Sequence, residues 1–291
     1  MESLEGLGRK VRTAHDLLSV VKTMKSLAAV NIRQYTAAAE SMDAYAAVVA
    51  QGWNALLWNH PPGRRSEGDD GPACCLVLGS DQGMCGQFNE LAAQCALAAM
   101  ANGENGENGG GTTVYWAIGD RLRAILEESG RVEEHFPVPV SIAAIGELID
   151  HIVSRFADLH AQGRVGRLRV CSNRLGRAGS YAPQSLQILP RSPLTQPQRK
   201  WPGRSLPLLG LRAEPLHAHL FHQHLFALIY TALAHSLASE NAARLTAMQA
   251  AERNISEMEE DLQARFRETR QNAITAELLD IVSGAEALET S

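Results

Sequence analysis

The 291-residue chain has neither proline nor glycine between Leu216 and Ser283. Both residues interrupt helices, so their absence over about 68 residues favours one continuous helix, roughly 100 Å long. A helix of that length cannot be buried in a compact core. Its apolar side chains therefore require a cover along the whole length.

Several other features are absent, and each absence excludes a class of protein. No apolar run reaches the roughly eighteen residues that a bilayer span needs. The first twenty residues include Glu5, Arg9 and Lys10, which argues against a signal peptide. The net charge of −5 gives no sign of the basic face of a nucleic-acid-binding protein. We therefore expect a soluble, cytosolic chain whose association with any membrane is indirect.

The chain has few cysteines, and their arrangement does not suggest a framework. The five are Cys74, Cys75, Cys85, Cys95 and Cys171. An odd number with two adjacent members fits neither a set of disulfides nor a metal knuckle. Free, buried thiols are expected.

Apolar residues recur with a heptad-like spacing inside the long uninterrupted stretch. Met248, Ile255 and Leu262 recur every seven residues, and Ile274 and Ile281 continue such a series further on. Sustained repeats of this kind favour a coiled coil over an ordinary surface helix. A helix-loop-helix hidden within the periodic run is the alternative.

A second long helix is expected within residues 1–59, where apolar residues step by threes and fours. The segment between Gly8 and Gly52 has neither glycine nor proline and corresponds to roughly 65 Å of helix. Packing this helix against a C-terminal helix at 213–289 would bury both apolar stripes. If a compact domain with close ends joins the two helices, the pairing is antiparallel.

That intervening domain is expected at residues 70–207, where short apolar runs alternate with amphipathic stretches. Strands are expected at 73–78, 112–118, 167–173 and 185–189, and helices at 90–100, 120–128 and 142–161. Such alternation predicts a mostly parallel, Rossmann-like sheet. The predicted fold class is α/β plus a long coiled coil. Glycine-rich residues 102–111 and proline-rich residues 190–207 are expected to be loops.

Residues 79–89 (GSDQGMCGQFN) form a candidate ligand site because they follow a predicted strand and precede a predicted helix. The segment lacks the Lys-Ser/Thr pair of a phosphate-binding loop, and its glycines miss the spacing of the dinucleotide fingerprint. Asp81 would also repel a phosphate. A tight turn with close backbone packing is the favoured interpretation, and nucleotide binding is the alternative.

Two further groups carry weaker signals. Cys85 has no histidine close in sequence to activate it as a nucleophile. On a helix, His219 and His222 fall on one side and His217 and His224 on the other, so one pair at most could share a metal. We expect no catalytic, cofactor or metal site in the chain.

Four segments point together to one family. They are VVKTMKSLAA at 20–29, GSDQGMCGQFN at 79–89, SENAARLTAM at 239–248 and RQNAITAELLDIVSGA at 270–285. They resemble the gamma subunit, the central shaft of F-type rotary ATP synthases. The resemblance covers both terminal helices and the α/β domain. The family loop usually has arginine where this chain has Gln82 and glycine where it has Gln87. These departures fit a divergent "alternate" bacterial branch that includes members regarded as sodium pumps, and they bear on the partners of the α/β domain.

The resemblance implies a noncatalytic subunit without a cofactor. Its coiled coil would turn inside the ring of alpha and beta subunits, and its α/β foot would bind the epsilon subunit and the membrane c-ring. Rotation of an asymmetric shaft would shift each catalytic site in turn, coupling ion translocation to ATP synthesis or hydrolysis. The implied location is the cytoplasmic face of the bacterial inner membrane.

The resemblance also implies which residues meet the partners. The residues expected to contact the catalytic ring are Met24 and Lys25 on the first helix and Arg270, Gln271 and Thr275 on the second. The residues expected to form an apolar tip inside the collar are Ile281, Val282, Ala285 and Leu288. From the residues alone, two other functions stay open. One is a small α/β enzyme with a coiled-coil oligomerisation arm, and the other is a static coiled-coil scaffold.

Overall fold

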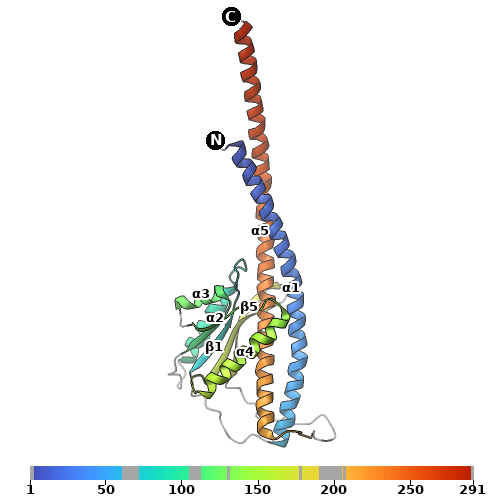
Figure 1. Cartoon of the computed structure of the whole chain (residues 1–291), viewed down its shortest axis with the longest axis vertical. Coiled ribbons are helices and arrows are strands. Elements are labelled where there is room, and N and C mark those ends of the chain that lie inside the picture. The colour runs from blue at the N-terminus through green and yellow to red at the C-terminus, as the bar shows by residue number, and fades with distance from the viewer. Residues whose placement is uncertain are drawn as a thin grey trace. The chain divides into compact units, whose positions relative to one another are not determined.

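The computed structural model describes residues 3–60, 72–104, 113–129, 132–176, 179–189, 205 and 208–289. Side chains at 102–104, 280 and 283–289 are outside the described set. The chain forms two compact units. One consists of residues 28–244, and the other combines residues 1–27 with 245–291. Two long helices, α1 and α5, contribute to both units (Figure 1).

A five-stranded sheet forms the centre of the unit built from residues 28–244. Its strands are β1 (Ala73–Leu78), β2 (Val114–Ile118), β3 (Val132–Phe136), β4 (Arg167–Leu175) and β5 (Tyr181–Leu189). Their order is β3-β2-β1-β4-β5, and only the β4–β5 pair is antiparallel. The predicted mostly parallel α/β fold is therefore confirmed.

Helices cover both faces of this sheet, as Figure 1 shows. Helices α2 (Phe88–Glu104) and α3 (Asp120–Ser129) pack on one face through alanines and leucines. Helix α4 (Ile142–Ala161) and part of α5 pack on the other face. Every residue of β1 is buried, as expected of a parallel strand enclosed on both faces.

Strand β3 was not predicted, because its sequence VEEHF reads as polar. Its charges are paired with side chains of neighbouring elements. Glu133 and Glu134 each lie 2.6 Å from an arginine nitrogen, of Arg164 and Arg155 respectively. These pairs let charged residues occupy an edge strand beside β2. A hydrophobicity pattern cannot reveal such partners, since they lie elsewhere in the chain.

The two long helices fall within the expected ranges 1–59 and 213–289, and they run through the glycine and proline positions that bounded their uninterrupted stretches. Helix α1 spans Leu4–Asn59 and continues through Gly52. A Cβ at Gly52 would lie 2.8 Å from Leu220 Cδ2, so the glycine permits close packing of the two helices. Helix α5 spans Ala213–Glu289 without interruption. Pro215 lies in its first turn, where no backbone donor is lost, and Gly284 does not end it. The helix-loop-helix alternative for this stretch is wrong.

Helix α2 also continues beyond its predicted end at residue 100, so that the first three residues of the expected 102–111 loop are helical. The rest of that loop, and nearly all of 190–207, lie outside the described residues. No helix within the described ranges is long and apolar enough to cross a membrane. The division into domains at 1–59, 70–207 and 213–289 stays a prediction.

Candidate functional site

The first candidate surface is the helix pair in the unit formed by residues 1–27 and 245–291. The pairing is antiparallel, because His15 lies 3.4 Å from Glu259 whereas Lys25 lies 2.5 Å from Glu252. On α1, the buried seam of this pair consists of Leu7, Ala14, Leu18 and Val21. Small and branched apolar side chains at this spacing allow two helices to approach closely.

The described part of α1 pairs with α5 up to about residue 270. Phe266 lies 3.4 Å from the position of a Cβ on Gly8, in the second turn of α1. With antiparallel pairing, Leu4 at the start of α1 lies opposite about residue 270 of α5. Residues 271–279 of α5 are all exposed. Among them and just beyond, large apolar side chains face solvent: Ile274 (49%), Leu278 (58%), Leu279 (61%), Ile281 (68%) and Val282 (52%).

The contact residues implied for α5 fall on one side of this uncovered segment. At 100° per residue, Arg270, Gln271, Thr275, Ile281, Val282, Ala285 and Leu288 span an arc of roughly 140°. Arg270 and Gln271 are exposed, and the Thr275 hydroxyl donates to the Gln271 carbonyl of its own helix. Ala285 and Leu288 are helical, but their side chains lie outside the described residues.

On α1, the two implied contact residues differ in their surroundings. Met24 is half-buried, and Lys25 is paired with Glu252 across the helix pair. The Lys25 charge is therefore partly neutralised by Glu252 of the same chain. The sequence reasoning missed Glu252, because a pair so distant in sequence leaves no local signal.

A second apolar stripe on α1 was also missed. Leu17, Val20 and Leu27 are each more than half exposed. Their spacing of three and seven places them on one side of the helix, different from the side of the buried seam. The same spacing rule, applied once more to the residues left over after the first stripe, would have found them.

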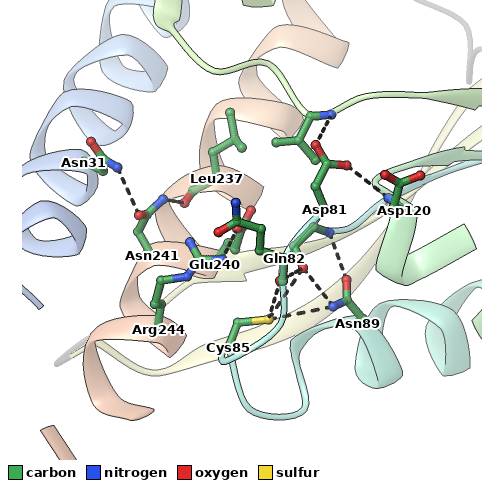
Figure 2. A network of polar contacts seen from close by, with 12 residues as sticks. Asn31, Asp81, Gln82, Cys85, Asn89, Asp120, Leu237, Glu240, Asn241 and Arg244 are labelled. Carbon is green, nitrogen blue, oxygen red and sulfur yellow. Dashed lines mark hydrogen bonds and ion pairs between the residues drawn. The ribbon is translucent and has the colours of Figure 1, made fainter. Parts of the chain in front are cut away.

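The second candidate is the loop between β1 and α2, residues 79–89. The backbone at Ser80 passes very close to the backbone at Gly119. A Cβ on Gly119, at φ +105°, would lie 2.6 Å from the Ser80 carbonyl oxygen. Asn89 accepts a hydrogen bond from the Ser80 amide at 2.9 Å and donates one to the Ser80 hydroxyl at 2.9 Å. The glycine turn is thus held closed by its own residues, as Figure 2 shows for Asn89 and Cys85.

Asp81 takes the place that a bound anion would use at the start of α3. Its carboxylate accepts from the Asp120 amide at 3.0 Å and from the Val138 amide at 3.1 Å (Figure 2). Free amides at a helix N-terminus are what attracts phosphate. Because Asp81 supplies the negative charge itself, the geometry favours the structural turn over the nucleotide site.

Cys85 lacks the surroundings of a nucleophile. The thiol is buried, and its sulfur lies within hydrogen-bond distance of Ser80 and of the Gln82 carbonyl. Burial raises the pKa of Cys85, with the Ser80 hydrogen bond acting in the opposite direction. All five cysteines are free thiols, and four of them are buried.

Of the histidines at the start of α5, His217 packs against aromatic rings. His217 lies edge-on to Trp53, with ring centroids 5.0 Å apart, and stacks on Phe221. His219 and His222 are exposed. Over the described part of the chain, no cluster of three or more His, Cys, Asp or Glu side chains could hold a metal ion.

The loop 79–89 is also anchored to α5. Phe88 is fully buried beside Ala243 and Cys85. The centroid of its ring lies 5.9 Å from the ring centroid of Tyr181 in β5. Gln82 and Gln87, which depart from the family pattern, have exposed side chains. The substitutions therefore lie on the surface of the loop.

Comparisons with known proteins agree over the whole chain. A family model described as ATP synthase matches residues 3–288. The ATP synthase gamma chain of Acidiphilium cryptum is 30% identical, with 99% of this chain and 100% of that protein covered. The gamma chain of Magnetococcus marinus is 27% identical, with the same two coverages of 99% and 100%.

Solved structures show the same fold at lower identity. A chain from the Euglena gracilis mitochondrial ATP synthase, in an OSCP/F1/c-ring structure, is similar with a TM-score of 0.59 and 16% identity, covering 98% of this chain and 94% of that one. A chain from the Tetrahymena thermophila central stalk/c-ring structure has a TM-score of 0.55 and 17% identity, covering 80% and 99%. Since a family model and a 30% identical relative both match over nearly its full length, this chain belongs to the family of ATP synthase gamma chains, which are noncatalytic subunits of that complex.

Proposed function

We propose that this chain is the central-stalk subunit that carries rotation between the membrane c-ring and the ring of alpha and beta subunits. In this role it couples ion translocation to ATP synthesis or hydrolysis. The α/β unit serves as the foot, which binds the epsilon subunit and the c-ring. The complex is membrane-associated, and this subunit lies peripherally on the cytoplasmic face of the bacterial inner membrane.

The observation that carries this proposal is the uncovered part of α5 beyond residue 270. Five large apolar side chains between Ile274 and Val282 are about half or more exposed. An apolar surface on an otherwise unpaired helix is costly in water and marks a site where another protein binds. A collar of alpha and beta subunits supplies such a cover, and Ile281, Val282, Ala285 and Leu288 form the part that turns inside it.

A second contact lies on α1. The stripe of Leu17, Val20 and Leu27 is exposed beside half-buried Met24. Together with Lys25 it offers the catalytic ring a surface that differs from the α5 face carrying Arg270, Gln271 and Thr275. A shaft whose sides differ cannot touch every catalytic site in the same way. Turning it therefore shifts the conformational equilibrium of each site in sequence, through differential contacts.

Co-purification tests this function. The chain, tagged at its foot, is expected to recover alpha and beta subunits from the cells that contain it. Ile281→Asp places a carboxylate on the apolar tip and is expected to reduce this recovery. Val48→Asp changes an equally exposed apolar residue (64%) outside the tip and serves as the matched control. Failure of the unaltered chain to recover alpha and beta subunits would refute the proposal.

A further inference from the structure

The contacts between α5 and the rest of its unit change in kind along the helix. From Leu225 to Leu237, apolar side chains of α5 pack into the main core beneath the sheet. The next segment is buried too, but it is polar: Ser239 is 0%, Glu240 6% and Asn241 5% exposed. This segment is the last part of α5 inside the unit of residues 28–244.

One set of hydrogen bonds ties this polar segment to the sheet. The Ser239 hydroxyl lies 3.2 Å from the Asn173 carbonyl oxygen of β4 and 2.7 Å from the His235 carbonyl oxygen of its own helix. It can therefore share its proton between the two. The Asn173 side chain in turn donates to the Phe88 carbonyl oxygen at 2.8 Å. This path joins α5 to β4 and to the first turn of α2.

A second set ties the same segment to α1. The Asn31 amide donates to the Asn241 side-chain oxygen at 3.3 Å, and Asn241 donates to the Leu237 carbonyl oxygen at 2.8 Å (Figure 2). The bond to Leu237 fixes which way the Asn241 amide points. Next to it, Arg244 and Glu240 form a largely buried ion pair at 2.7 Å.

Directional contacts resist a kind of motion that apolar contacts tolerate. The hydrophobic effect depends on buried area and has no preferred direction, so it opposes a small turn of a helix less sharply than hydrogen bonds do. Hydrogen bonds weaken steeply when distance and angle change. Buried hydrogen bonds leave unpaired polar groups away from water when they break, which is unfavourable. Bonds from one segment to both α1 and β4 therefore oppose rotation of α5 about its own axis.

We propose that Asn31, Asn173, Ser239 and Asn241 form a torsional lock, which transmits torque between the α/β unit and the helices. The lock rests on the proposed rotary function. Through these residues the foot turns α5 during synthesis, and α5 turns the foot during hydrolysis. They are positioning residues, since each of them acts through hydrogen bonds to other elements of this chain. Their contribution is needed when the shaft works against a load.

The test compares two assembled complexes in membrane vesicles. One contains the unaltered chain, and the other contains the double variant Ser239→Ala/Asn241→Ala. Ions pumped per ATP hydrolysed are measured twice, with the opposing gradient dissipated and with it imposed. Without a gradient, the double variant is expected to match the unaltered complex. Against the gradient it is expected to lose pumping while it still hydrolyses ATP. Ser41→Ala is the matched control, because the Ser41 hydroxyl is exposed and bonds only within α1, to the Ala37 carbonyl.

The outcomes separate the lock from the function on which it rests. Equal pumping per ATP under load in variant and unaltered complexes would overturn the lock. A loss already present without a gradient would assign these residues a merely structural role, and would also overturn it. If the double variant fails to assemble, Asn31→Ala, which removes only the link to α1, is measured in the same way with the same expectation. If the unaltered complex pumps no ions on ATP hydrolysis, the rotary function itself fails.

Discussion

At the scale of single residues, the loop of residues 79–89 shows how a motif that resembles a ligand site can be used for packing. Its polar side chains are satisfied by the protein itself. Asp81 accepts two backbone amides, and Asn89 exchanges two hydrogen bonds with Ser80. The structure explains why an acidic residue, which argues against a phosphate site, occurs in this loop. Asp81 acts as the anion at the start of α3.

The close backbone approach at this loop predicts that position 119 does not tolerate a side chain. Gly119→Ala is expected to destabilise the chain by at least about 2 kcal/mol, because Gly119 has φ +105° and a Cβ would lie 2.6 Å from the Ser80 carbonyl oxygen. Urea unfolding of the purified chain measures the change. Gly163→Ala is the matched control. Gly163 has φ +70° with nothing within 4 Å of a Cβ, so only backbone strain of about 1 kcal/mol is expected. Equal losses would show that the close approach does not matter.

Glu240 gives a prediction about pH. Burial raises the pKa of Glu240, and Arg244 opposes the shift. A carboxyl whose pKa is raised by folding contributes stability that is complete below its unfolded pKa and is lost as pH rises through the folded value. Glu240→Gln removes this titration. The free energy of unfolding of the variant should therefore rise relative to that of the original chain as pH increases from the ordinary value of 4.5. Urea titrations over a pH series measure the difference, and a difference that falls with pH would contradict the assignment.

At the scale of elements, the uncovered face of α5 predicts a loss of function without a loss of folding. Arg270→Ala is expected to lower the ions pumped per ATP in the assembled complex, because Arg270 lies on the side of α5 assigned to the catalytic ring. The unfolding free energy of the chain should change by less than about 0.5 kcal/mol, since Arg270 is exposed.

The matched control for Arg270 is Arg265→Ala on the same helix. Arg265 is also exposed, pairs with Asp261 at 2.9 Å and points to another side of α5. It should leave pumping unchanged. If both variants lowered pumping equally, the effect would belong to the helix in general and the assigned face would be wrong. If Arg270→Ala destabilised the fold as much as it reduced pumping, its role would be structural.

Much of the architecture could be predicted at this scale, because it follows from local patterns. The absence of helix breakers predicted α5, and the alternation of apolar runs predicted the parallel sheet. The errors have a common physical cause. Strand β3 carries Glu133 and Glu134, which pair with arginines elsewhere in the chain, and Gly52 lies inside a helix with Leu220 packed against it. Tertiary contacts decided both, and they leave no trace in a short window of sequence.

The candidate surface was predictable only in part, for the same reason. The apolar residues of the α5 face share a helical period, so they could be identified from sequence. The pairing of Lys25 with Glu252, and the polar bonds from Ser239 and Asn241 to β4 and α1, join residues far apart in the chain. Their partners become visible only once the fold brings the elements together.

At the scale of the whole molecule, the two compact units share α1 and α5, which run without a break through both. A helix has a continuous hydrogen-bonded backbone, so a turn applied in one unit is passed along the same covalent element to the other. This continuity is what a subunit that transmits torque requires and what a static scaffold does not need.

Rotation of the chain within the assembled complex can be observed directly. The complex is held on a surface through its beta subunits, and a bead is attached to a cysteine introduced by Gly210→Cys, an exposed loop position with nothing within 4 Å of a Cβ. On addition of ATP, the bead is expected to turn in one direction, in steps that stop when ATP is exhausted. A complex that hydrolyses ATP while the attached bead remains still would show that this chain does not rotate.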